Sequence, residues 1–561
     1  MGCFSKVREN LKPSKLPENV DDGLETIDEY NKRWLSIRVI YFTMFLMSLA
    51  FSIILTGVWP FLDKLDPKAG KEFMGLVVAA NPLGQMIFSP LFGYWQNKSG
   101  SMRIPLLCSL TTFSIASAIY SSLELVPSHV KYWMLGSRFL IGVSSANIAV
   151  CRSYLSSATR LSERTGAVSM ISLAQVLGFI VGPALQAAVT PLGSQGFRIL
   201  GGAVILNMYT AAGWINVLMG IANIVMCMPS IFEERKVAAR EVMIMQGKTS
   251  EKETWKAMKP DYVSAWTLIV AFFVLVFNFV LLETLGTSLT MDQFGWSKEQ
   301  ALYYMGILLS VGAVIACVTF VGIKPLCKMF REEYVLIWGG FSLMVLGRVL
   351  YIPWGDAPPK VAEVFNITIP LGPNGSNNSL YNDPDSEIYL GCPKTQTWCA
   401  TTNALTLNQF LIGFGFTSIG YPIGVTLIQT IFSKILGPRP QGVWMGMMTG
   451  AGCLSRVLGP ICVGSIYTRF GTYWTFGMTT IMMLISMVWL LLFKKRLIPP
   501  EVEKHPPVEM QPLNVVLLEN GPKDSSLETN STHEVLDHQS KDGEVLLPSS
   551  KTVKIVPKRS I

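Results

Sequence analysis

Five charged side chains stand inside otherwise apolar stretches of this sequence, and they have the clearest capacity for chemistry. The stretch SRFLIGVSSANIAVCRS carries Arg138 and Arg152, 14 residues apart, with no other charge between them. A charge at the centre of a bilayer costs at least about 2.5–3.5 kcal/mol, so each needs a partner or a wet cavity. A surplus of guanidinium groups in a protected cavity attracts anions, because guanidinium is permanently charged and loses its water readily. The other three charged side chains inside apolar stretches are Glu283, Arg348 and Arg456.

The two arginines of this stretch are expected to have different roles. In one continuous helix they would share a face but lie about 21 Å apart along the axis. We expect the deeper Arg138 to lie on an ion path with Arg456. Arg152 is expected to reach the interface or to pair with the loop that contains Glu163. An Arg138–Glu283 bridge that closes one side is the alternative to anion attraction, and both can hold if the bridge opens in one state.

Other candidate residues give weaker signals. Gln175 and Gln409 are expected to line the path, although such amides usually join helices to one another. Arg348 is expected to anchor its own helix. No apolar stretch contains histidine, which leaves Glu283 as the one plausible coupling acid. The sequence shows no phosphate-binding glycine loop, metal cluster or nucleophile–base pair, so we expect neither an enzyme nor a cofactor.

The composition of the chain predicts membrane-spanning helices that position these residues. Half of the 561 residues are hydrophobic and only 15% are charged, whereas soluble domains are nearer a quarter charged. A span needs about 20 mostly apolar residues. Twelve stretches qualify, which predicts an all-α membrane protein; they lie at roughly 36–60, 73–95, 104–123, 132–153, 166–189, 208–228, 262–286, 301–323, 333–352, 404–432, 443–464 and 473–493.

The distribution of basic residues predicts the orientation. The segment 229–261 is rich in lysine and arginine, as is the N-terminal tail 1–35. The positive-inside rule places both, with the C-terminal tail 496–561, in the cytosol. The loop 353–403 on the opposite side holds sequons at Asn366, Asn374 and Asn377, and the spacing of Cys392 and Cys399 permits a local disulfide in an oxidising compartment.

An internal repeat divides the apolar part into two bundles, at 36–228 and 262–495. RFLIG begins at Arg138 and QFLIG begins at Gln409. Each is followed, about 45 to 51 residues later, by a Gly-Pro pair, Gly182-Pro183 or Gly459-Pro460. The FLIG motif and the Gly-Pro pair occur in the same order in both parts of the chain. This repetition indicates two parallel six-helix halves with a cargo path between them. The Gly-Pro pairs are expected mainly to serve helix packing.

The segment GYWQNKSGSMR, from Gly93 to Arg103, resembles the loop after the second helix of the major facilitator superfamily, with matches at Gly93, Asn97, Lys98 and Gly100. Asn97 and Lys98 are expected to have a structural or gating role. RWLSIRVIYFTMFLMSLAFS, LETLGTSLTMDQFGWSKEQA and FSKILGPRPQGVWMG resemble endolysosomal members of that superfamily. The resemblance implies twelve helices in two halves, a lysosomal or endosomal membrane and chloride conduction. A proton-coupled exporter of a small organic anion or lipid breakdown product, moving by alternating access, is the alternative, and a scaffold role is a third.

The tail contains a sorting motif. DGEVLL has an acidic residue, three spacers and two leucines, at Asp542, Leu546 and Leu547, which is the form that cytosolic sorting adaptors read. Adaptors, the bilayer and a small anion are therefore the expected partners. The modest net charge of +8 is explained by membrane topology and does not indicate nucleic acid.

Overall fold

The computed structural model describes residues 24–55, 57–199, 204–248, 260–355 and 396–499, with the short pieces 250–251, 253, 255, 357–361, 363–364 and 389–393. The three sequon asparagines Asn366, Asn374 and Asn377 and the tail motif Asp542 to Leu547 lie outside the described residues. In the described part, the strands form two short antiparallel pairs: β1 (Phe197–Ile199) with β2 (Val204–Leu206), and β3 (Glu363–Val364) with β4 (Tyr389–Leu390).

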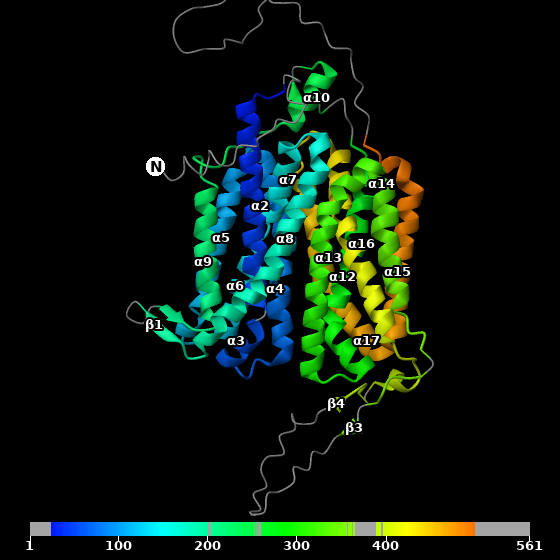
Figure 1. Ribbon diagram of the computed structural model, residues 1–561. Helices are drawn as coiled ribbons and strands as arrows, with labels where there is room; N and C mark the ends of the chain where they lie inside the picture. Colours follow the sequence, from blue (N-terminus) through cyan, green and yellow to red (C-terminus); the bar gives the residue numbers. More distant parts are fainter. Residues whose placement is uncertain are drawn as a thin grey trace, which may run out of the picture. The chain divides into compact units, whose positions relative to one another are not determined.

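The first half of the chain forms a bundle of apolar helices (Figure 1). Its central pairs are α2 with α8 and α5 with α9, and one continuous apolar core runs through them. The elements are α2 (Ile27–Leu55), α3 (Val58–Leu65), α4 (Gly70–Ser99), α5 (Arg103–Ser121), η1 (Leu123–Leu125), α6 (Val130–Ser144), α7 (Asn147–Ala158), α8 (Leu161–Val189), η2 (Thr190–Leu192) and α9 (Thr210–Met226).

The second half forms a second bundle, joined to the first by a segment that contains α10 (Ala238–Gln246). Its helices α12 and α17 pack together, as do α15 and α16, around two apolar clusters. The elements are α12 (Tyr262–Phe294), α13 (Lys298–Met329), α14 (Glu332–Tyr334), the π-helical η4 (Val335–Phe341), α15 (Ser342–Leu350), η6 (Thr397–Ala400), α16 (Leu407–Leu436), α17 (Gly442–Phe493) and η7 (Lys494–Leu497).

Ten helices in the described residues are long and apolar enough to cross a membrane. One of them, α17, is two helices joined at Gly471, whose φ of 82° and ψ of −169° interrupt the helical backbone. The apolar helix α9 is shorter than the ten. Within the described residues, each of the twelve apolar stretches of the sequence thus lies mostly in helix, and the helices are often longer than the stretches. For example, α2 begins at Ile27, inside the predicted tail, because Arg33 is buried there among acidic partners.

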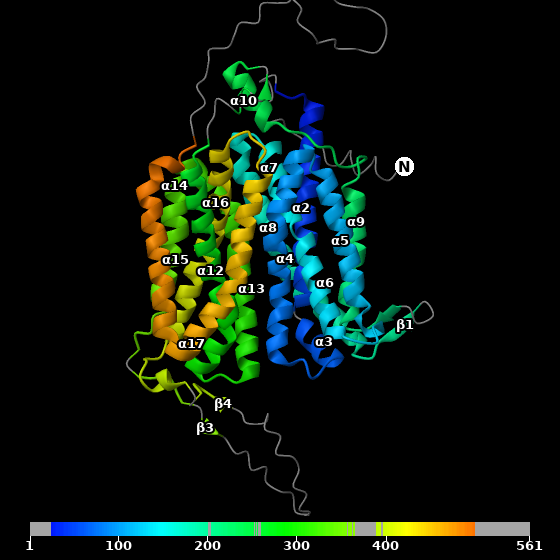
Figure 2. The same cartoon turned by 180° about the vertical axis from the view of Figure 1, so that it is seen from behind.

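The two ends of the bundles differ. α10 lies at one end, and both strand pairs lie at the other, in both views (Figures 1 and 2). We call these the α10 end and the β end. The two halves contact each other chiefly through α4 with α17 and through α8 with α13.

Candidate functional site

A polar site lies between the two halves, where side chains from both bundles meet. Arg152 of α7 donates a hydrogen bond from Nη2 to Oε1 of Gln175 of α8, at 3.0 Å. The Arg152 guanidinium also interacts electrostatically with Tyr421 of α16 and with Arg456 of α17. Arg456 in turn interacts with Glu283 of α12 and lies within reach of the Tyr421 hydroxyl. Five side chains from five helices therefore form one cluster, which we call the inter-half site.

The inter-half site is partly accessible. Arg152, Gln175, Tyr421 and Arg456 are half-buried, and Glu283 is exposed. The ring of Phe279 stacks on Tyr421, with centroids 3.9 Å apart, and so holds the Tyr421 ring in place. Two guanidinium groups and one carboxylate leave the site with one net positive charge. Such a site can bind a small anion between two arginines that would otherwise repel each other.

Arg138 does not lie in this site. It is fully buried inside the first half, with its guanidinium carbon 5.7 Å from the centroid of the Phe51 ring and Tyr120 nearby. No described residue accepts a hydrogen bond from any of its three side-chain nitrogens. The expected Arg138–Glu283 bridge is not present in the described structure, because Glu283 faces Arg456 instead. A two-residue turn at Ser145 and Ala146 separates α6, which carries Arg138, from α7, which carries Arg152.

The remaining candidate positions have local roles. Arg348 is fully buried in the second half, donates from Nη2 to the carbonyl oxygen of Asn278, and lies 5.5 Å from the centroid of the Tyr351 ring. The bond to Asn278 ties α15 to α12, whereas Tyr351 directly follows α15 itself. Gln409 lies at the β end, where its Oε1 accepts hydrogen bonds from the N–H and hydroxyl of Thr406, the N-cap of α16. The structure therefore places Gln409 in a helix cap, away from the centre of the helices.

The two halves meet tightly at the α10 end, along α4 and α17. Gly93 and Gly442 touch backbone to backbone, since a Cβ added to Gly93 would lie 2.1 Å from the carbonyl oxygen of Gly442. Asn97 accepts a hydrogen bond at Oδ1 from the N–H of Gly442, at 2.9 Å, and so satisfies a free donor at the start of α17. Lys98, beside it, is exposed. We call this contact of α4 with α17 the glycine seam.

A polar cluster joins the halves a second time at the same end. Lys434 of α16 forms an ion pair with Glu332 of α14, at 2.7 Å, and Glu332 also accepts a hydrogen bond from Thr165 of α8. The hydroxyls of Ser433 and Ser156 lie 2.7 Å apart across the same boundary. Together with the glycine seam, these contacts close the α10 end of the space between the halves.

The Gly-Pro pair of α8 lies at a close contact between α8 and α2. Pro183 has no N–H, so the carbonyl of Phe179 four residues earlier is left without its helical donor. The hydroxyl of Ser52 in α2 donates to that carbonyl at 3.0 Å. Gly182 permits this approach, because a Cβ there would lie 2.5 Å from the Cβ of Ser52. α2 and α8 are thereby fixed to each other at mid-length.

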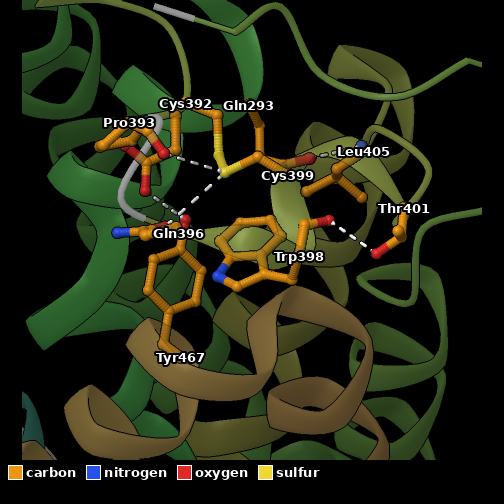
Figure 3. Close-up of a disulfide and its surroundings, with 10 residues drawn as sticks. Gln293, Cys392, Pro393, Gln396, Trp398, Cys399, Thr401, Leu405 and Tyr467 are labelled. Carbon is orange, nitrogen blue, oxygen red and sulfur yellow. Dashed lines mark hydrogen bonds between the residues drawn. A yellow bond between two sulfur atoms is a disulfide. The ribbon is translucent and has the colours of Figure 1, made fainter.

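A disulfide-closed loop covers the β end of the second half (Figure 3). Cys392 and Cys399 form a disulfide with their Cα atoms 6.0 Å apart. Trp398 packs on Tyr467, with ring centroids 5.4 Å apart, and against Gly471, where α17 changes direction. The Tyr467 hydroxyl donates to buried Asp292 of α12 at 2.8 Å. The loop is thus attached to the ends of helices of one half.

The sequence reasoning missed several of these residues. Tyr421 stands next to Pro422 inside an apolar stretch, and a tyrosine so placed is a usable signal of a polar site. Asp292 follows the stretch 262–286 and would have been considered if the helix had been extended to Phe294. Glu332 and Lys434 flank predicted spans, and nothing in their local sequence indicates that they pair.

The comparisons with known proteins agree with this architecture. The sequence profile described as Major Facilitator Superfamily matches residues 40–370 and 395–536. The chain is 40% identical to Major facilitator superfamily domain-containing protein 8 of Xenopus laevis over 493 residues, which is 87% of this chain and 96% of the relative. It is also 27% identical to Multidrug resistance protein 2 of Bacillus subtilis over 47% of this chain and 60% of that one.

Solved structures with the same fold include the human organic anion transporter MFSD10, with a TM-score of 0.56 and 16% identity over 82% of this chain and 99% of that one. The fucose transporter FucP in its outward conformation aligns with a TM-score of 0.57 and 11% identity, over 84% of this chain and 100% of that one. The predicted family is therefore confirmed: the chain belongs to the major facilitator superfamily of multi-pass membrane transport proteins.

Proposed function

We propose that this protein transports small anions across an endolysosomal membrane, and that chloride is the first ion to test. The observation that supports the proposal most strongly is the pair Arg152 and Arg456, which come from different halves and interact across the boundary. Each is half-buried, so each has given up part of its water. The two guanidinium groups repel each other in this low-dielectric environment. A monovalent anion between them would be attracted to both and would offset that repulsion.

The contacts at the two ends support a transport cycle in which access alternates. The glycine seam and the Lys434–Glu332 cluster close the α10 end. The described hydrogen bonds between the halves gather at this end, which favours entry to the inter-half site from the β end. Exchange of these contacts for new ones at the β end would release the anion on the other side, as in rocking transporters.

We further propose twelve spans with both termini in the cytosol. The ten long helices supply eleven spans, because α17 is counted as two, and the shorter apolar helix α9 would be the twelfth. The α10 end would be cytosolic, because the segment around α10 carries Arg235, Lys236 and Arg240. The β end would be lumenal, where an oxidising compartment maintains the Cys392–Cys399 disulfide.

A second candidate is the export of a small organic anion coupled to protons. The exposed carboxylate of Glu283 beside Arg456 favours it, since protonation of Glu283 would strengthen the hold of the two arginines on an anionic cargo. An accumulating organic acid in lysosomes that lack the protein, with chloride currents unchanged, would support this candidate over chloride.

Current recording from endolysosomes with and without the protein tests the proposal. We expect chloride substitution by a large impermeant anion to abolish a current that depends on the protein. Arg152→Gln and Arg456→Gln should each reduce it by at least tenfold, because about 1.4 kcal/mol of lost anion stabilisation is a factor of ten. Arg38→Gln, an exposed arginine of α2, is the matched control and should leave it unchanged. Equal chloride currents in all four proteins would refute the role of the inter-half site.

A further inference from the structure

A separate cavity lies at the β end of the second half, away from the inter-half site. Its volume is about 550 Å³, and it opens to the outside. One wall is the loop that carries the disulfide, with Thr397, Thr402 and Asn403. The other wall is the turn where α17 changes direction, with Arg469, Tyr473 and Trp474. We call this the β-end cavity.

The lining of the β-end cavity is suited to an anionic group. Arg469 is the one charged side chain among the described residues that line it. Arg469 is exposed, so its five N–H donors can reach a ligand in the cavity. The threonine hydroxyls and the Asn403 amide add neutral donors. Trp398 also lines the cavity, and its indole N–H has no acceptor in the described part of the chain although the residue is only 5% exposed.

The position of the cavity favours a lipid over a free solute. Gly471 separates two apolar helices, so the cavity lies at the depth where both leave the hydrocarbon. Tyr473 and Trp474 are 55% and 63% exposed there, which is typical of aromatic side chains at a membrane interface. The exposed apolar face of the last helix continues from Trp474 through Ile481 and Ile485. The spacing of seven and four residues keeps these on one face, along which an acyl chain can lie.

We propose that the β-end cavity binds the headgroup of an anionic glycerophospholipid, with its phosphate at Arg469 and its acyl chains along the last helix. A planar guanidinium with neighbouring hydroxyls binds phosphate oxygens in two directions at once. The aromatic side chains hold the glycerol region at the interface. The bound lipid stabilises the turn at Gly471 and the disulfide loop that packs on it. This site is independent of the anion that the inter-half site would transport.

Titration of the full-length protein in detergent with phosphatidylglycerol, followed by native mass spectrometry, tests the proposal. We expect at least one phosphatidylglycerol to be retained, and phosphatidylcholine to be retained more weakly. Arg469→Gln should weaken phosphatidylglycerol binding about fivefold, the factor for one basic residue at an anionic membrane surface. Arg198→Gln is the matched control, since Arg198 is an exposed arginine at the same end, in β1 of the other half. It should bind as the unaltered protein does.

Further measurements separate the lipid from other ligands. Trp474→Ala should weaken retention of both lipids, because it removes part of the interfacial wall without changing charge. Glycerol 3-phosphate should not displace phosphatidylglycerol; if it does so at comparable concentration, the site binds free phosphate and the lipid assignment is wrong. Equal binding by Arg469→Gln and Arg198→Gln, or equal retention of the two lipids, would also overturn the proposal. A melting curve for each variant shows that the protein remains folded.

Discussion

The glycine seam yields the sharpest prediction, because an added methyl group has no room there. In Gly93→Ala, the new Cβ would lie 2.1 Å from the carbonyl oxygen of Gly442 and 2.4 Å from its carbon. An ordinary carbon–oxygen contact is about 3.3 Å, so α4 and α17 must separate by about 1 Å. Both atoms belong to the backbone of α17 and cannot rotate away.

The expected effect is a shift of the conformational equilibrium. Overpacking of this kind costs about 1–3 kcal/mol, which is about 5–150-fold in a two-state equilibrium. The cost applies only while the α10 end is closed, so Gly93→Ala should increase the population in which that end is open. The gain in helix propensity from glycine to alanine, about 1 kcal/mol, applies to every conformation and cancels.

A distance measurement across the α10 end checks the shift. Spin labels on Ser99 and Arg331, which are exposed on opposite halves, report the separation by double electron–electron resonance in a background that lacks the accessible thiols. The matched control is Gly75→Ala, in the same helix, where an added Cβ meets nothing within 4 Å. The reasoning fails if the two variants give the same distance distribution.

Three further predictions concern stability. Arg33→Gln should lower the free energy of unfolding by about 1.5–3 kcal/mol, because it leaves buried Glu25 with Arg160 alone and removes the ion-pair partner of half-buried Glu163, while Arg38→Gln should change thermal denaturation little. Asn97→Ala should cost about 1 kcal/mol and open the α10 end slightly, visible with the same spin labels. Cys392→Ser should cost about 2 kcal/mol and expose the loop to trypsin, whereas a loop equally resistant without its disulfide would show that packing alone holds it.

Much of the helical fold could be predicted because hydropathy acts on long segments, whereas the orientation from the positive-inside rule stays a prediction. The repeat of RFLIG and Gly-Pro identified two halves, and the packing role of Gly182-Pro183 follows from the chemistry of proline. The break between α6 and α7 could not be predicted, since Ser145 and Ala146 contain neither proline nor glycine. Arg138 packs against Phe51 inside the first half, whereas Arg152 contacts Gln175 and faces the second half.

The candidate site was harder to predict, because it depends on contacts between residues far apart in the chain. Arg456 and Glu283 were identified from their charge alone, and both lie in the inter-half site. Arg152 was assigned to the interface because its sequence position is near the end of a span. Only the packing of α7 against the second half shows that it faces Arg456. Gln409 was assigned to the path because it is a polar residue within a predicted span, although its position three residues after Thr406 also fits a helix cap.

The glycine seam has a consequence for electrical insulation. A membrane that maintains a pH gradient cannot tolerate a continuous file of water molecules through a protein, because protons hop along it. Where two helices meet through long side chains, rotamer changes open transient gaps for water. Gly93 and Gly442 have no side chains to move, and their backbones already satisfy their hydrogen bonds within their helices or through Asn97. At the glycine seam, the closed contact is therefore one of backbone against backbone, which rotamer changes of Gly93 and Gly442 cannot open.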